Sequence, residues 1–171
     1  GCDELGVAGA LTGEPVRMVE AKTVPGAYAL AIRLAAPLAL DRRRWRDVNL
    51  EAGLYIYCGS ANGPGGIGAR LRRHARPSKV RHWHIDALTA AGKVIAAGAF
   101  IGGSECAILE RLSRGRGTQI PVPGFGSTDC RHCSAHLAQI PDGRKLENLL
   151  RRLGADSIWL ERSAFRLKQI Q

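Results

Sequence analysis

The chain has 171 residues, a length that fits one domain with its own hydrophobic core. Its formal net charge of +10 at pH 7 is large for this length and indicates an anionic partner, nucleic acid ahead of a membrane surface. No apolar run approaches the roughly 18 residues of a membrane span. An odd number of cysteines, 5, favours reduced thiols over a disulfide framework, so we expect a soluble, cytoplasmic protein without a membrane segment.

Hydrophobic periodicity predicts alternating strands and helices, with Pro or Gly at the ends of the helices. We expect a half-buried strand over residues 26–40 and further strands over 54–59 and 94–101, with a last strand or strand pair over 158–167. Helices are expected over 67–75, 82–91, 105–112 with Ser104 as the N-cap, and 144–153, the last one basic and amphipathic. The connecting segments include a charged loop over 41–46, a Gly-rich turn over 63–66 and a turn-rich loop over 121–130. The strand over 94–101 is apolar throughout and should be the central or most covered one. This order predicts an α+β fold, in which helices flank a small mixed or antiparallel central sheet of three strands and a C-terminal extension follows.

The strand over 54–59 and the helix after it place reactive side chains close together. Tyr55 and Tyr57 share one face of the strand, because side chains two apart point the same way. Arg70 and His74 lie one turn apart on the helix. Phenol, guanidinium and imidazole groups that meet in this way suit a phosphodiester better than a neutral substrate.

Several short motifs occur in the order found in one known family. They are Gly26-Ala27-Tyr28, Tyr57-Cys58-Gly59, Arg70 and His74 on the next helix, and Glu105 after the third strand. Together they resemble the GIY-YIG nuclease superfamily, most closely a branch with a Gly-Pro-Gly-Gly turn, a His-Trp-His-Ile-Asp segment and a Pro-Gly-Phe-Gly-Ser-Ser-Asp-Cys loop. The resemblance covers about residues 24–138. The resemblance implies a GIY-YIG-like nuclease domain, which we place over residues 24–142. We expect a lead-in over residues 1–23 before it, and an extension over 143–171 that lies outside the resemblance and packs on the same domain.

The resemblance implies a metal-dependent endonuclease that hydrolyses phosphodiesters, with DNA a better candidate substrate than RNA. The resemblance implies that Tyr28 activates the attacking water and that Tyr57 lines the same pocket. Arg70 would stabilise the charge at phosphorus, and His74 would orient the nucleophile or the phosphate. Glu105 would bind Mg²⁺ or Mn²⁺. A tyrosine pKa is near 10, so we expect the Arg-rich helix to favour the phenolate of Tyr28.

Further basic side chains lie around the predicted helix. Those expected to contact nucleic acid are Arg72, Arg73, Arg76, Lys79, Arg81 and His84. Asp129 could assist the metal or hold a histidine. The alternative is a catalytically silent, basic module that binds nucleic acid. Removal of Glu105 or Tyr28 would abolish cleavage and spare binding only in an enzyme.

Cys130 and Cys133 form a Cys-x-x-Cys pair, and His136 follows closely. These three residues could supply most of a tetrahedral zinc site in a zinc-stabilised interaction domain. The fourth ligand would have to be Cys106 or Cys58, brought close by the fold. Two other hypotheses for Cys130 and Cys133 are a redox pair and ordinary buried or loop thiols.

Overall fold

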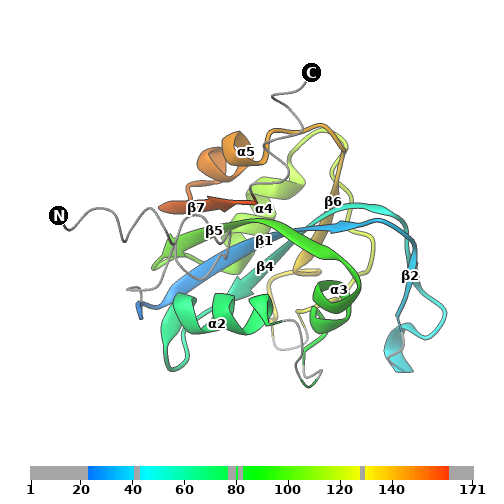
Figure 1. Cartoon of the computed structure of the whole chain (residues 1–171), viewed down its shortest axis with the longest axis horizontal. Coiled ribbons are helices and arrows are strands. Elements are labelled where there is room, and N and C mark those ends of the chain that lie inside the picture. The colour runs from blue at the N-terminus through cyan, green and yellow to red at the C-terminus, as the bar shows by residue number, and fades with distance from the viewer. Residues whose placement is uncertain (1–22, 41–42, 77–79, 81–82, 128–129, 162–171) are drawn as a thin grey trace.

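The computed structural model describes residues 23–40, 43–76, 80, 83–127 and 130–161. The described elements are β1 (Gly26–Leu34), β2 (Leu38–Ala39), a 3₁₀ turn (Arg43–Trp45), β3 (Asn49–Leu50), β4 (Gly53–Ser60), α2 (Gly66–Ala75), α3 (Asp86–Ala91), β5 (Lys93–Ile101), α4 (Glu105–Ser113), β6 (Leu137–Ile140), α5 (Leu146–Leu153) and β7 (Ser157–Leu160). In this part of the chain, an antiparallel five-stranded sheet has the order β6-β4-β1-β5-β7, and β2 pairs with β3 separately (Figure 1). None of the described helices combines the length and apolarity needed to cross a bilayer.

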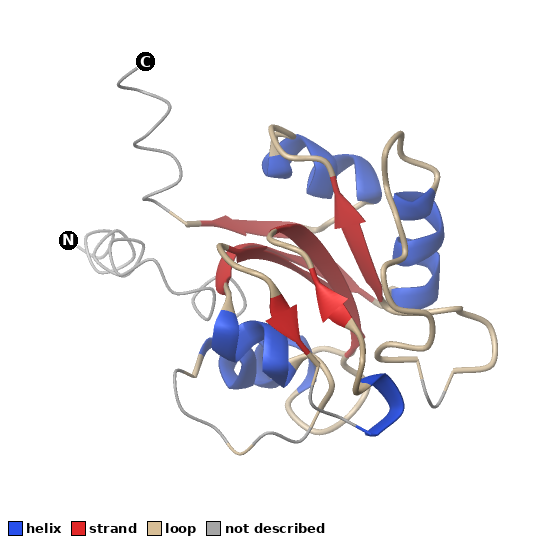
Figure 2. Ribbon diagram, turned by 90° about the vertical axis from the view of Figure 1, so that its right-hand side faces the viewer, coloured by secondary structure: helices blue, strands red, loops and turns tan. Residues whose placement is uncertain are grey.

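The central strand is β1, and both of its faces are buried between helices (Figure 2). Its bulky residues pack on the side of α2 and α3; they are Tyr28, Leu30, Ile32 and Leu34. Its small residues pack on the side of α4 and α5; they are Ala27, Ala29 and Ala31. We predicted a half-buried strand over residues 26–40 from this alternation, and that prediction was wrong because both faces of β1 are buried. The alanines let the second helix layer approach closely, and the strand itself ends at Leu34.

The predicted α+β class is confirmed, but the sheet is larger than the three strands expected. β6 pairs with β4, and β7 pairs with β5. β6 has only 4 residues, too few for a period to show in the sequence. β7 covers the start of the strand predicted over 158–167, of which residues 162–167 lie outside the described part. The strand predicted to be central or most covered, β5, lies beside the centre, between β1 and β7.

The helices lie close to their predicted positions, except that α3 begins at Asp86 and not at residue 82. The Asp86 carboxylate accepts a hydrogen bond of 2.9 Å from the backbone N–H of Trp83, which fixes a turn before the helix. Ser104 is the residue before α4, as predicted, but its hydroxyl makes no capping hydrogen bond.

The Gly-rich turn brings α2 to the beginning of β1. Gly65 and Gly66 have φ angles of 81° and 59°, which favour glycine, and a Cβ on Gly66 would overlap the backbone carbonyl of Val24. The N–H of Ile67 donates to that carbonyl at 3.0 Å. The start of β1 lies between the ends of β4 and β5, so the sequence motifs meet at this end of the sheet.

Candidate functional site

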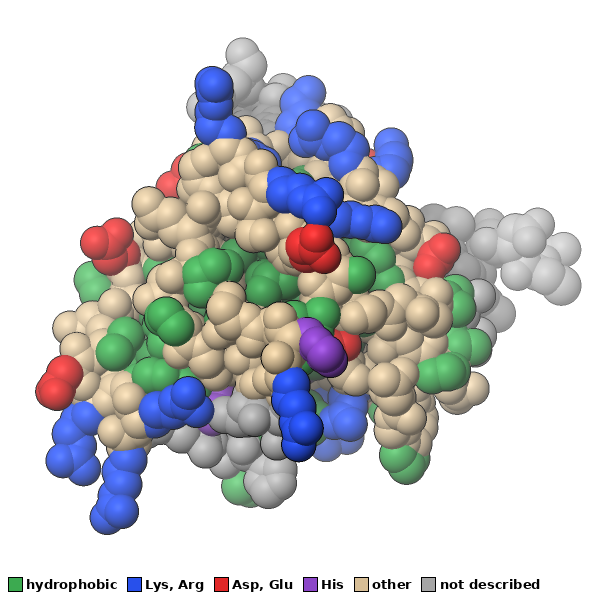
Figure 3. All heavy atoms as spheres, turned by 180° about the vertical axis from the view of Figure 1, so that it is seen from behind, with side chains coloured by type: hydrophobic (Ala, Val, Ile, Leu, Met, Phe, Trp, Pro, Cys, Tyr) green, Lys and Arg blue, Asp and Glu red, His purple; other side chains and the backbone are tan. Residues whose placement is uncertain are grey.

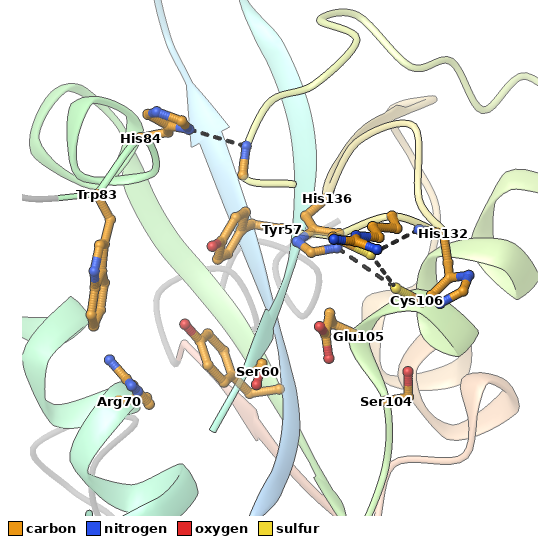
Figure 4. A pocket seen from close by; sticks show the side chains of 14 residues that line it. Tyr57, Ser60, Arg70, Trp83, His84, Ser104, Glu105, Cys106, His132 and His136 are labelled. Carbon is orange, nitrogen blue, oxygen red and sulfur yellow. Dashed lines mark hydrogen bonds between the residues drawn. The ribbon is translucent and has the colours of Figure 1, made fainter. Parts of the chain in front are cut away.

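A pocket of about 820 Å³ opens where these motifs meet (Figure 4). We call it the sheet-end pocket; its lining includes Tyr28, Tyr57, Ser60, Arg70, Trp83, His84, Ser104, Glu105, Cys106 and His136. Arg70 and Trp83 form one side of it, Glu105 and His136 form the opposite side, and Tyr57 lies between them (Figure 4). Four of the five residues predicted to be catalytic line this pocket; the fifth, His74, does not.

His74 lies behind Tyr28. Its Nε2 atom is 2.7 Å from the Tyr28 hydroxyl, and its side chain is buried. Burial, reinforced by the neighbouring Tyr57, raises the pKa of Tyr28 well above its ordinary value, and the positive charges of Arg70 and Arg73 only partly oppose this. The expectation that nearby arginines would favour the Tyr28 phenolate was therefore wrong, because desolvation outweighs their charge.

Tyr57 lies next to Tyr28, with 6.3 Å between the ring centroids. Burial also raises its pKa above the ordinary value for tyrosine. Across the β1–β4 ladder, Tyr28 is directly opposite Gly59. A Cβ on Gly59 would overlap the phenol ring of Tyr28, so the glycine of the second motif makes room for the tyrosine of the first.

The side wall formed by α2 is built around Trp83. The guanidinium of Arg70 lies 4.6 Å from the Trp83 ring centroid and that of Arg73 lies 3.9 Å from it. Arg73 also donates to both carboxylate oxygens of Asp86, each at 2.8 Å, and this hydrogen bonding raises its pKa. Asp86 is fully buried, so this ion pair ties α2 to the turn that carries Trp83.

Glu105 is in the first turn of α4 and half-buried. Among the described residues, its carboxylate has no hydrogen-bond or ion-pair partner, although it lines the pocket. Mg²⁺ commonly binds one or two carboxylates and completes its octahedral shell with water and substrate phosphate. Of the described residues that line the pocket, Glu105 is the one with a carboxylate, and a carboxylate in a pocket open to solvent fits such an ion.

A group of cysteines and one histidine borders the same pocket, and two of the cysteines, Cys106 and Cys133, are joined by a disulfide. The Cys3His cluster consists of Cys106, Cys130, Cys133 and His136. Its ligand atoms all lie within 4.8 Å of one another, and the cluster could hold a metal ion such as zinc. Burial lowers the pKa of His136, and the Glu105 charge opposes that shift. Cys58, the other candidate for a fourth ligand, is buried in β4 outside the cluster.

The remaining predicted contacts are more dispersed. His84 lines the pocket, and its Nδ1 accepts a hydrogen bond of 3.3 Å from the N–H of Gly126. Arg72 is half-buried on α2, Arg76 is the exposed residue that follows α2, and neither lines the pocket. Three residues considered from the sequence lie outside the described residues: Lys79, Arg81 and Asp129.

Sequence reasoning missed Asp86 and Trp83, which organise one wall of the pocket. Both belong to the His-Trp-His-Ile-Asp segment quoted for the family resemblance, but nothing in that segment shows that its carboxylate would pair with Arg73, 13 positions away. Cys106 was only one of two candidates for a fourth ligand, because sequence spacing cannot show which cysteine the fold brings near.

The family model described as a domain of unknown function, DUF123, matches residues 27–158, and the chain belongs to this family. No curated protein and no solved structure matches the chain.

Proposed function

We propose that this DUF123 domain is an endonuclease that hydrolyses the phosphodiester bonds of nucleic acid with the help of a divalent cation. DNA is a better candidate substrate than RNA. The observation that carries the proposal is the sheet-end pocket itself. It presents to one space the Tyr28 hydroxyl, the Arg70 guanidinium and the carboxylate of Glu105, which has no hydrogen-bond or ion-pair partner in the described part of the chain. A base, a fixed positive charge and a ligand for a hard cation are the groups that phosphodiester hydrolysis requires.

Tyr28 and His74 act together on the attacking water. When Nε2 of His74 is unprotonated, it accepts the proton of Tyr28 across their 2.7 Å contact. The phenol oxygen can then take a proton from water, whose oxygen forms the new bond to phosphorus while the ester oxygen leaves and takes a proton from solvent. This transfer needs no stable phenolate, and so it is compatible with the raised pKa of Tyr28.

Arg70 stabilises the negative charge that develops on the phosphoryl oxygens. Its planar guanidinium offers a forked donor, and its stacking on Trp83 limits the orientations available to it. Tyr57 can donate a hydrogen bond to the water or to a phosphoryl oxygen. Glu105 would hold Mg²⁺ or Mn²⁺, and such an ion would supply positive charge that stabilises the phosphoryl group during cleavage.

The charge of the molecule favours a polyanionic substrate. The chain carries 25 Lys and Arg against 15 Asp and Glu. On the face shown in Figure 3, basic side chains gather along two opposite margins. Contacts of this kind bind phosphates without reading base sequence, so we expect a strong dependence of binding on salt and little base specificity.

The proposal is tested by cleavage of end-labelled single-stranded, duplex and branched DNA in Mg²⁺ or Mn²⁺. Glu105→Gln should abolish cleavage. Glu110→Gln is the matched control, because Glu110 lies on the same helix but is exposed and paired with Arg114 at 2.7 Å. Cleavage that survives in Glu105→Gln, or binding without cleavage in the wild type with either cation, would contradict the proposed activity. The second result would instead support a silent binding module.

A further inference from the structure

The Cys3His cluster draws its ligands from segments far apart in the sequence. Cys106 is in the first turn of α4, whereas the other three members lie in the loop that leads into β6. The Sγ atom of Cys106 is 3.2 Å from that of Cys130 and 3.8 Å from Nε2 of His136 (Figure 4). The fold thus aims three sulfur atoms and one imidazole nitrogen at a common point.

We propose that the Cys3His cluster of the reduced chain binds one Zn²⁺ ion in a tetrahedral site. Zinc bonds of about 2.3 Å to sulfur and about 2.0 Å to nitrogen place neighbouring ligand atoms roughly 3.5 to 3.8 Å apart. The distances from Cys106 Sγ, 3.2 Å to the sulfur of Cys130 and 3.8 Å to Nε2 of His136, lie within a few tenths of an ångström of this spacing. On binding, each thiol gives its proton to solvent.

A disulfide alone does not account for the cluster. The structure joins Cys106 and Cys133 by a disulfide, which uses two of the four groups. It gives no role to the thiol of Cys130 or to the imidazole of His136, both of which converge on the same sulfur. A dithiol or phosphine reductant converts the pair to two thiols, and all four groups then have a function as zinc ligands.

The surroundings of the cluster suit a bound metal. The backbone N–H groups of His132 and Cys133 both donate to the sulfur of Cys130, at 3.4 Å each, and such bonds stabilise a thiolate. The His136 side chain is buried, and its Nε2 faces the sulfur of Cys106 at 3.8 Å. Three members of the cluster are half-buried and two of them border the pocket, so an ion can enter from solvent.

Zinc at this position would also define the wall of the pocket. Cys106 directly follows Glu105, so a zinc ion would tie the first turn of α4 to the loop containing Gly126 and hold the Glu105 carboxylate toward the pocket. This consequence rests on the proposed nuclease function, whereas zinc binding does not.

The test begins with the full chain purified in a phosphine reductant and supplied with zinc. We expect one zinc ion per wild-type chain by elemental mass spectrometry, and loss of the ion in Cys106→Ser and His136→Ala. The matched control is His132→Ala, which alters an exposed histidine of the same loop and should keep the ion. In the wild type, Co²⁺ should give the intense thiolate charge-transfer absorption of a tetrahedral sulfur-rich site, a measurement that does not depend on whether variants fold.

Absence of stoichiometric zinc and of the Co²⁺ absorption in the reduced wild type would overturn the proposal. Zinc uptake that persists in both ligand variants would overturn the assignment of the ligands. Cleavage measured in excess Mg²⁺ separates the two proposals. Loss of zinc in Cys106→Ser with an unchanged cleavage rate would refute the link to Glu105, whereas zinc binding in a wild type that never cleaves would refute only the nuclease.

Discussion

The hydroxyl of Tyr28 and Nε2 of His74 are 2.7 Å apart in the interior of the domain, where only the phenol reaches the sheet-end pocket. This contact connects the first motif, on the central strand, with the histidine of α2, 46 positions further along the chain. The contact provides the buried Tyr28, whose pKa is raised, with a proton acceptor, Nε2 of His74. The catalytic proposal depends on this pair more than on the arginines around it.

Tyr28→Phe keeps the ring and removes the hydroxyl, so we expect cleavage to fall by about 100-fold or more while DNA binding stays unchanged. The double variant Tyr28→Phe, His74→Ala should be no slower than the slower single variant, because the two residues serve one proton transfer. Tyr55→Phe is the control, since the Tyr55 hydroxyl donates to the backbone of Glu51 and does not line the pocket. Single-turnover rates of the wild type, the two single variants, the double variant and Tyr55→Phe test this, and a wild-type rate in Tyr28→Phe would refute the role of this phenol.

Gly59→Ala should displace the Tyr28 ring, because the new methyl group would overlap it. We expect a loss of about 1–3 kcal/mol in unfolding free energy and slower cleavage. In a Tyr28→Ala background the same change should cost little stability, since the ring is gone. Urea unfolding of the four proteins of this cycle checks the prediction, and additive costs would show that Gly59 does not act through Tyr28.

The sequence was enough to predict most of the residues that line the candidate pocket, but not the pKa shifts of those residues. Strand and helix periodicity assigned Tyr57, Arg70 and Glu105 to the strand and the two helices that carry them, and the three residues line one pocket in the fold. The raised pKa of Tyr28 was not foreseeable, because it depends on burial of the phenol in the core between the sheet and the helices α2 and α3. The same limit applies to β6, whose four residues are too short to show a period, and to Asp86, whose partner comes from another helix.

The Arg73–Asp86 ion pair should be important for stability. Arg73→Leu leaves the buried Asp86 carboxylate without its guanidinium partner, and we expect a cost of about 3 kcal/mol or more in unfolding free energy. The exposed pair between Arg33 and Asp142 also has an N–O distance of 2.8 Å, yet Arg33→Leu should cost less than about 1 kcal/mol. Equal costs in urea unfolding of the two variants would contradict this view of the buried pair.

Alkaline pH should unfold the domain. The pKa values of Tyr28 and Tyr57 are raised in the folded state, so below about pH 10 both the folded and the unfolded chain keep these protons and stability is intact. Above that pH the unfolded chain ionises first, and stability falls. Tyrosinate absorbance should therefore rise together with loss of circular dichroism. Tyr57→Phe should move the transition to higher pH, whereas ionisation of all three tyrosines near pH 10 in a folded chain would contradict the burial effect.

The most direct test of the account measures binding and cleavage of one labelled DNA by the wild type and by Glu105→Gln in Mg²⁺. The account predicts similar affinities for the two proteins, since the basic surface is unchanged, and metal-dependent cleavage by the wild type alone. Binding by both proteins without cleavage by either would contradict it and leave a nucleic-acid-binding module in which Glu105 has no catalytic task.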